Sequence, residues 1–379
     1  MKNNYSIIGG GIIGLSVGWQ LARKGFGVQI FERDTAGRSA SWYAAGMLAP
    51  RSEAGFEESQ LLAFGLESLR LYPQFLSELE HDSGISVNLE KRGTLMVGLD
   101  RDDTERLRRL YAFRKNLGLP ISWLSGTEAR EIEPMLSPRV ASAMWIPDDV
   151  NIDNRALVDA LRIAFQKCGG VLHENTPIDF VNIVDEEIKS VRTSTGEFET
   201  ENVILAAGCW SKSIPGIPES IAPPVRPVKG QIMTLRMDKT CTLSHIIRAP
   251  EVYLVPKENG RLIVGASAEE MGFDTTTTAG HIKELLENAW EVVPSVYDLA
   301  IEEVSAGLRP GSRDNEPIIG PTEIAGLHFA TGHFRSGILF APATAYGLAE
   351  YFTTGIMPES LIHFQPSRFN KQHISETVA

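Results

Sequence analysis

The most constraining feature of this chain is a glycine cluster directly after its first apolar run. Residues 5–8 predict a short buried strand, and residues 9–14 match the pattern G-x-G-x-x-G. Apolar residues then recur at helical spacing, and a second apolar run over residues 28–31 ends in Glu32. Strand, glycine turn, helix, strand and acid in this order are the context of a dinucleotide-binding turn. The chain therefore predicts a Rossmann-like N-terminal unit.

Each element of that pattern has a separate physical task. Gly9 permits the tight turn, Gly11 lets a pyrophosphate approach the backbone, and Gly14 lets the helix pack closely on the strand. The phosphates are expected at the positive N-terminal end of the helix. Glu32 is placed to accept hydrogen bonds from a ribose diol.

Composition limits the classes of protein to consider. A chain of 379 residues predicts two domains, and 43% hydrophobic with 22% charged residues is typical of a globular protein. A net charge of −12 argues against a nucleic-acid or anionic-membrane partner. The three cysteines lack C-x-x-C spacing, so no metal site is predicted and a cytoplasmic location is expected. Glycines interrupt the first apolar run, which argues against a signal peptide or a membrane span.

Patterns along the rest of the chain predict an alternation of helices and strands. Pro215 to Pro227 predicts a crossover between domains. Met233 and Trp290 are expected in the core. Helices are expected near 57–80 (with a bend at Pro73), 102–117, 149–168, 281–290 and 338–352. Strands are expected near 93–99, 171–172, 180–184, 190–193, 202–208, 231–235, 253–256, 262–266 and 299–305.

These elements predict an α/β fold of two domains. A Rossmann-like nucleotide-binding domain is interrupted twice by a mostly antiparallel substrate domain. The expected bounds are 1–82, 146–225 and 304–379 for the nucleotide-binding domain, and 83–145 and 226–303 for the substrate domain.

Five later segments carry a resemblance to a known family. They are residues 44–48 (AAGML), 227–230 (PVKG), 253–256 (YLVP), 307–311 (GLRPG) and 332–339 (GHFRSGIL). In this order and spacing, the chain from Tyr5 to about Phe352 resembles the D-amino-acid oxidase superfamily of FAD-dependent enzymes. Within it, the chain is most similar to the glycine oxidase branch, which contains the oxidase of thiamin biosynthesis.

The resemblance implies non-covalent FAD, because no cysteine stands near Arg309, where covalent relatives attach the flavin. Ile178 would meet the adenine, and the strand ending at Gly208 would lie close to the ligand. The loop before the helix at Ile338 would face the N1–C2=O edge of the ring. The implied FAD residues beyond the glycine turn are Ile12, Ile13, Glu32, Arg33, Ala40, Ser41, Ala45, Gly46, Met47, Ile178, Gly208, His333, Phe334, Arg335, Ser336, Gly337, Ile338 and Leu339.

Three residues are candidates for direct contact with substrate. Arg309 offers a planar fork that matches a carboxylate bidentately, and Tyr253 would add a phenolic donor. The role of the Arg335 side chain, as a gate or an ion-pair partner, is left open. Ala268 and the pair Trp42-Tyr43 depart from the glycine oxidase pattern, which leaves the substrate open among glycine, sarcosine and small D-amino acids.

By the resemblance, the substrate loses its Cα hydrogen as a hydride to flavin N5. The imine is then hydrolysed, and molecular oxygen takes the electrons to give hydrogen peroxide. Two alternatives stay open: a D-amino-acid dehydrogenase that reduces a quinone or a partner protein, and a flavoprotein subunit of an electron-transfer complex. Whether the chain forms a homo-oligomer is also left open.

Overall fold

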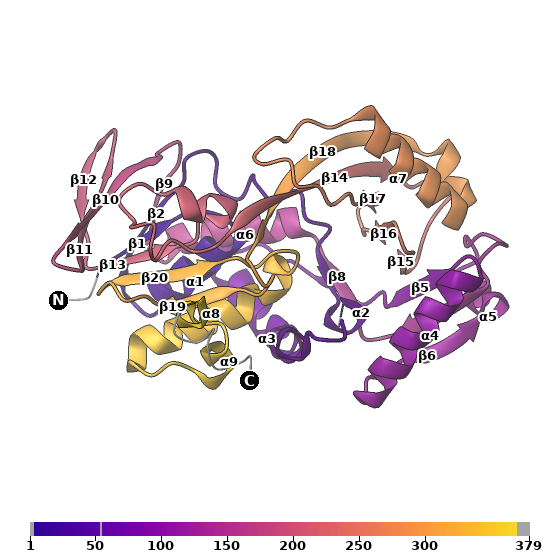
Figure 1. The fold of residues 1–379 in the computed structure, drawn as a ribbon. Coiled ribbons are helices and arrows are strands. Elements are labelled where there is room, and N and C mark those ends of the chain that lie inside the picture. The colour runs from indigo at the N-terminus through magenta and orange to yellow at the C-terminus, as the bar shows by residue number, and fades with distance from the viewer. Residues whose placement is uncertain (1–3, 54, 370–379) are drawn as a thin grey trace.

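The structure is a computed structural model that describes residues 4–53 and 55–369, and its first layer is a mostly parallel sheet (Figure 1). Strand β1 pairs in parallel with β2 and β13, and β19 closes the edge antiparallel to β20. The predicted nucleotide-binding sheet is therefore assembled from distant stretches of chain. Its order is β19 (Ile318–Pro321), β20 (Leu327–Thr331), β13 (Asn202–Leu205), β1 (Asn4–Ile8), β2 (Gly27–Phe31) and β9 (Val171–His173).

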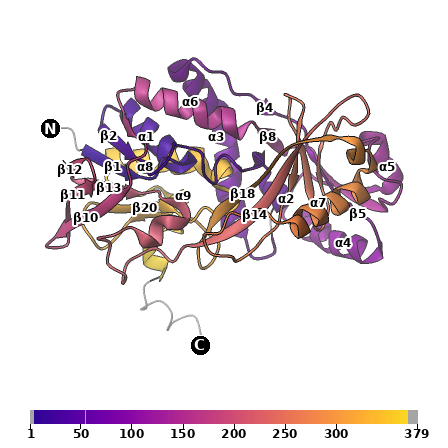
Figure 2. The ribbon, with the colours of Figure 1, turned by 90° about the horizontal axis from the view of Figure 1, so that it is seen from above.

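Both faces of this sheet are covered, which explains why its strands are continuous apolar runs (Figure 2). Four helices pack against one another over one face: α1 (Ile12–Arg23), α3 (Ser59–Ser83), α6 (Asn154–Lys167) and α8 (Gly337–Thr354). The other face meets a small antiparallel sheet of β10 (Ile178–Val184), β11 (Glu187–Thr193) and β12 (Gly196–Glu199).

The second large sheet is antiparallel except where β15 runs parallel to β5. Helix α7 (Ala279–Val292) packs against β14 and β17, and α4 (Arg101–Asn116) and α5 (Gly126–Ile132) pack at its far end. The strand order is β18 (Ala300–Gly311), β14 (Arg226–Arg236), β17 (Arg261–Gly265), β16 (Tyr253–Pro256), β15 (Ile246–Arg248), β5 (Thr94–Gly98), β7 (Ser142–Ile146) and β6 (Ser122–Ser125).

A third, short sheet lies between the two lobes (Figure 1). It joins β3 (Met47–Leu48), β8 (Val150–Ile152) and β4 (Leu89–Glu90). The shorter helical segments are α2 (Pro50–Glu53), α9 (Glu359–Ile362), η1 (Gly208–Ser213), η2 (Pro294–Asp298) and η3 (Pro366–Phe369).

The predicted α/β fold of two domains is present. Strand β18 runs through the predicted bound between residues 303 and 304 and pairs with β14 along its length. The exact domain bounds therefore stay a prediction. Within residues 4–53 and 55–369, every helix is too short or too polar to cross a lipid bilayer.

Two expectations differ from the structure. The helix expected over 149–168 begins only at Asn154, because Val150–Ile152 forms β8 and the Asp153 carboxylate caps the amides of Arg155 and Ala156. Trp290 is not in the core: it is 51% exposed on the outer side of α7, whereas Met233 is fully buried.

Candidate active site

One cavity of about 600 Å³ collects most of the predicted site residues. Among the predicted residues, Gly14, Ser336 and Leu339 lie outside its wall, and the last two border a smaller neighbouring cavity with Arg335. The wall includes Gly9, Gly11, Ile12, Ile13, Glu32, Arg33, Ala40, Ser41, Ala45, Gly46, Met47, Ile178, Gly208, Tyr253, Arg309, His333, Phe334, Arg335, Gly337 and Ile338.

The glycine turn forms one end of the cavity. Gly9 has φ +107°, and a Cβ on it would lie 2.4 Å from the Ala206 carbonyl oxygen. A Cβ on Gly14 would lie 2.0 Å from the Gly9 carbonyl oxygen, so Gly14 serves packing. Gly11 caps α1 without a side chain, and only Ser41 Oγ lies near its missing Cβ, at 3.5 Å. The turn therefore leaves open space at the positive end of α1.

Glu32 is held beside this turn by backbone amides. Its carboxylate accepts hydrogen bonds from the amides of Gly10, at 2.8 Å, and Asp34, at 3.1 Å. The carboxylate also lines the cavity, so it lies at the end of β2 where a ribose diol is expected.

A flat wall near Glu32 was missed by the sequence analysis. The Arg33 guanidinium lies 3.6 Å from the ring centroid of Trp210, and Trp210 stacks on Phe273. Trp210 lies in η1, a few residues after β13 ends at Leu205, but nothing in the residue pattern indicates that it lines the cavity.

The other end of the cavity is built on the second sheet. The Arg309 guanidinium extends from β18 across Gly230 of β14, where a Cβ would lie 2.3–2.6 Å from the guanidinium atoms. Arg309 Nη1 donates to the Ser267 carbonyl oxygen at 3.0 Å. In the described part of the chain, no carboxylate forms an ion pair with Arg309. The guanidinium charge is therefore not neutralised by a carboxylate, and the donors that do not bind the Ser267 carbonyl can bind an anion in the cavity.

Tyr253 approaches Arg309 from the neighbouring strands. Its phenol lies over Gly265, where a Cβ would be 2.6 Å from the hydroxyl oxygen. Burial raises the pKa of Tyr253, while the Arg309 charge and a hydrogen bond from Arg309 oppose this rise. The phenol therefore stays protonated at neutral pH and can donate a hydrogen bond.

Gly230 and Gly265 make room for these two side chains, and both were missed as site residues. A lone glycine inside a strand is the sequence signal of such a close approach. Arg248 was missed too: it lies opposite Tyr253 in the register and pairs with Glu53 at 3.0 Å on the cavity wall. No motif surrounds Arg248, so no sequence signal pointed to it.

The N-terminus of α8 adds a third wall. Ser336 provides no side-chain cap, and Gly337 and Ile338 face the cavity. His333 is buried and hydrogen-bonded to Thr344 at 3.1 Å, and burial lowers its pKa to about 3. His333 is therefore neutral, and the positive groups at this wall are the N-terminal end of α8 and the Arg335 guanidinium two residues before it.

Trp42, which departs from the glycine oxidase pattern, does not line the cavity. Its ring lies between the guanidinium groups of Arg38 and Arg155, 3.6 and 4.6 Å from the ring centroid, and outside the cavity wall. Its neighbour Tyr43 and the small Ala268 do line the cavity.

The donor set fits FAD at this site. A glycine turn at a helix N-terminus suits a pyrophosphate, Glu32 suits a ribose, and the space beside Ala45–Met47 continues to Arg309. The same cavity thus offers a dinucleotide cradle and an anion-binding arginine.

Comparisons with known proteins agree with this geometry. The model of the family "FAD dependent oxidoreductase" (DAO) matches residues 4–351. A glycine oxidase from Geobacillus kaustophilus is 33% identical over 351 residues, which is 92% of each chain. Its crystal structure superposes with a TM-score of 0.91 at 32% identity, over 97% of this chain and 100% of that one.

A longer relative extends the comparison. The bifunctional protein ThiO/ThiG of Trichormus variabilis is 32% identical over 98% of this chain, which spans 56% of that protein. With the family model, the fold and the cavity in agreement, FAD is the cofactor and the reaction class is amino-acid oxidation. The chain belongs to the DAO family of FAD-dependent oxidoreductases.

Proposed function

We propose that this chain oxidises a small amino acid, with glycine or sarcosine as the leading substrates and molecular oxygen as the electron acceptor. The observation that carries the proposal is the Arg309 fork. It has no carboxylate ion-pair partner in the described part of the chain and faces the same cavity as the glycine turn. A substrate carboxylate is the anion that this fork fits.

The proposed FAD site runs along the glycine turn. Gly9, Gly11 and the first turn of α1 would hold the pyrophosphate, and Glu32 the ribose. The segment from Ala45 to Met47 and the N-terminus of α8 would line the ring, with Ile178 at the adenine. The chemistry that bound FAD supplies is two-electron oxidation of the substrate.

The chain's own residues bind and orient the substrate. Arg309 holds the carboxylate, and the phenolic O–H of Tyr253 donates a hydrogen bond to the same group. The positive end of α8 favours negative charge in its neighbourhood. Glu53 is neutralised by Arg248, and Glu32 is bound by backbone amides. Glu251, the third carboxylate on the described cavity wall, is exposed to solvent. The described wall therefore offers no buried carboxylate without a partner to act as a general base, and the substrate amine is expected to react in its neutral form.

Substrate size is proposed from the residues beside Arg309. Ser267 and Ala268 are small, and Tyr43, from the segment before Ala45, lines the same cavity. The similarity to a named glycine oxidase supports a small substrate, and the ThiO/ThiG relative supports a role in thiamin biosynthesis. Oxidation of glycine or sarcosine would yield an imine, then glyoxylate with ammonia or methylamine, and hydrogen peroxide.

The test is an oxygen-electrode and peroxide assay of the purified, FAD-loaded protein with glycine, sarcosine, D-alanine and L-alanine. We expect oxygen consumption matched by peroxide, fastest with glycine or sarcosine. Substrate-dependent bleaching of the flavin that is reversed only by a quinone or dye would replace this proposal with a dehydrogenase. Bleaching by none of the four amino acids would reject the substrate class.

A further inference from the structure

Lys257 is a buried amine that the proposed chemistry does not use. It directly follows strand β16 and is 2% exposed. Its Nζ donates to the carbonyl oxygen of Ile152 at 2.8 Å and to that of Ala45 at 2.6 Å. The Lys257 side chain therefore connects the end of β16, in the second large sheet, to β8 and to the residue two positions before β3, both strands of the short third sheet.

The segment that Lys257 holds lines the cavity. Ala45 and Gly46 belong to the wall proposed to face the FAD ring. Gly46 has φ +72°, and a Cβ on it would lie 2.2 Å from the Ile152 carbonyl oxygen and 2.9 Å from Lys257 Nζ. The Ile152 amide in turn donates to the Gly46 carbonyl oxygen at 2.9 Å. Lys257 and β8 thus hold the Ala45–Gly46 segment by hydrogen bonds, and their atoms leave no space for a side chain at Gly46.

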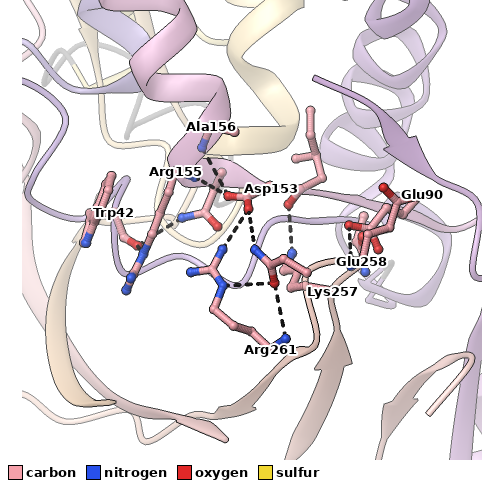
Figure 3. Close-up of polar contacts among 12 residues, drawn as sticks. Trp42, Glu90, Asp153, Arg155, Ala156, Lys257, Glu258 and Arg261 are labelled. Atoms are coloured by element: carbon pink, nitrogen blue, oxygen red, sulfur yellow. Dashed lines mark hydrogen bonds and ion pairs between the residues drawn. The ribbon is translucent and has the colours of Figure 1, made fainter. Parts of the chain in front are cut away.

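Among the residues that the structure describes, no carboxylate forms an ion pair with the amine of Lys257. Within the described residues, both nearby carboxylates have other partners (Figure 3). Glu90 binds Arg92 at 2.6 Å and Asp153 binds Arg261 at 2.7 Å. Burial lowers the pKa of Lys257 to about 8. Burying a cation that only carbonyl groups bind costs folding stability. A contribution to stability therefore does not explain the presence of Lys257, which indicates another role.

Strand β16, which Lys257 directly follows, begins with Tyr253, and Tyr253 lines the substrate end of the cavity. We propose that Lys257 is a positioning residue that sets the Ala45–Gly46 segment relative to Tyr253, and thereby the cofactor ring relative to the substrate carboxylate. This inference rests on the proposed function for the placement of ring and carboxylate in the cavity.

Lys257→Met tests the inference because methionine keeps most of the unbranched apolar stem of the side chain and removes its donors. We expect the FAD dissociation constant to rise about 10-fold, because the variant loses both charged hydrogen bonds that hold the Ala45–Gly46 segment and Ile152 in place. The visible absorption spectrum of the bound flavin should shift. The kcat should fall while KM for the amino acid stays within about 3-fold, because Arg309 and Tyr253 remain.

Arg261→Met is the matched control. Arg261 bridges the same two lobes through Asp153, and neither residue lines the cavity (Figure 3). This variant should lower the melting temperature of the apo-protein and leave the flavin spectrum and kcat unchanged. Should Lys257→Met fail to fold, Lys257→Gln carries the test, because its shorter amide cannot reach both carbonyl groups.

Two results would overturn the inference: wild-type FAD affinity, spectrum and kcat in the folded Lys257 variant, or equal changes in Arg261→Met. Either result together with a strong kinetic defect in Arg309→Ala leaves the proposed function standing. A shifted flavin spectrum in Lys257→Met with wild-type kinetics in Arg309→Ala would instead reject the proposed substrate anchor and keep Lys257 as a residue that positions the flavin.

Discussion

The two ends of the cavity are built in different ways. The nucleotide end is made mostly of backbone from one short stretch, with Gly9 and Gly11 before α1 and Glu32 at the end of the next strand. The substrate end is made of side chains, Arg309 and Tyr253, that cross glycines on neighbouring strands. The first end depends on local backbone geometry, and the second depends on strand register. Variants at the two ends should therefore separate cofactor binding from substrate binding.

The largest expected effect follows from filling the space at Gly230. In Gly230→Ala, the new methyl group would meet the Arg309 guanidinium at 2.3–2.6 Å, and this flexible side chain would move aside. We expect kcat/KM to fall by an amount that corresponds to about 2–5 kcal/mol of lost transition-state stabilisation, the cost of losing a desolvated charge partner. FAD affinity should stay normal in an equilibrium titration.

Gly311→Ala on the paired strand is the control for this variant. A Cβ there would meet Val228 at 3.3 Å and leave Arg309 in place. If Gly230→Ala keeps full activity, Arg309 does not anchor the substrate from the position seen here.

A weaker effect is expected at the nucleotide end. Glu32→Ala should weaken FAD binding by about 1.5–3 kcal/mol, the scale of hydrogen bonds to a charged group. Glu251→Ala, which removes a carboxylate elsewhere on the same wall, should leave FAD affinity unchanged. Equal FAD affinity in wild type and Glu32→Ala would refute the ribose assignment.

Acid pH should lower the folding stability of the protein through His333, which lies in the cavity wall a few residues before α8. The pKa of His333 is about 3 in the folded state against 6.5 when exposed, so the unfolded chain takes up the proton first. The contribution of His333 to stability is present above about pH 6.5 and is lost as the pH falls toward 3.

Through His333 alone, the free energy of unfolding should fall by about 2 kcal/mol between pH 7.5 and pH 5. His333→Gln keeps a partner for Thr344, so its apo-protein should lose less stability over this range in chemical denaturation. The same pH dependence in wild type and variant would show that His333 is not the neutral, buried group described here.

The smallest effect is expected at Tyr253. Tyr253→Phe removes one phenolic hydrogen bond and keeps the ring over Gly265. The expected loss in kcat/KM is about 0.5–1.5 kcal/mol, with normal FAD content by absorbance. A loss as large as that of Gly230→Ala would mean that Tyr253, rather than Arg309, carries most of the carboxylate binding.

Much of the nucleotide end could be predicted from sequence, because each step of it is local. Gly9 needs a positive φ, and Glu32 comes directly after β2. Asp153 shows the limit of such reasoning: one capping residue inside an apparent helix separates β8 from α6.

The substrate end could be predicted only in part. Arg309 and Tyr253 lie in recognisable motifs, but Arg248 and Lys257 depend on which strands become neighbours. Trp42 departs from the glycine oxidase pattern close to Ala45 in sequence, yet its ring lies between two arginines and does not line the cavity. Sequence proximity does not fix the direction of a side chain in an irregular loop.

The most direct test of the account is anaerobic flavin reduction by glycine or sarcosine in Arg309→Ala, measured by stopped-flow absorbance with FAD affinity determined in parallel. The account predicts normal FAD binding, a loss of about 2–5 kcal/mol in the second-order rate constant for reduction, and only partial recovery in Arg309→Lys. Reduction at the wild-type rate, or a defect explained entirely by loss of FAD, would contradict it.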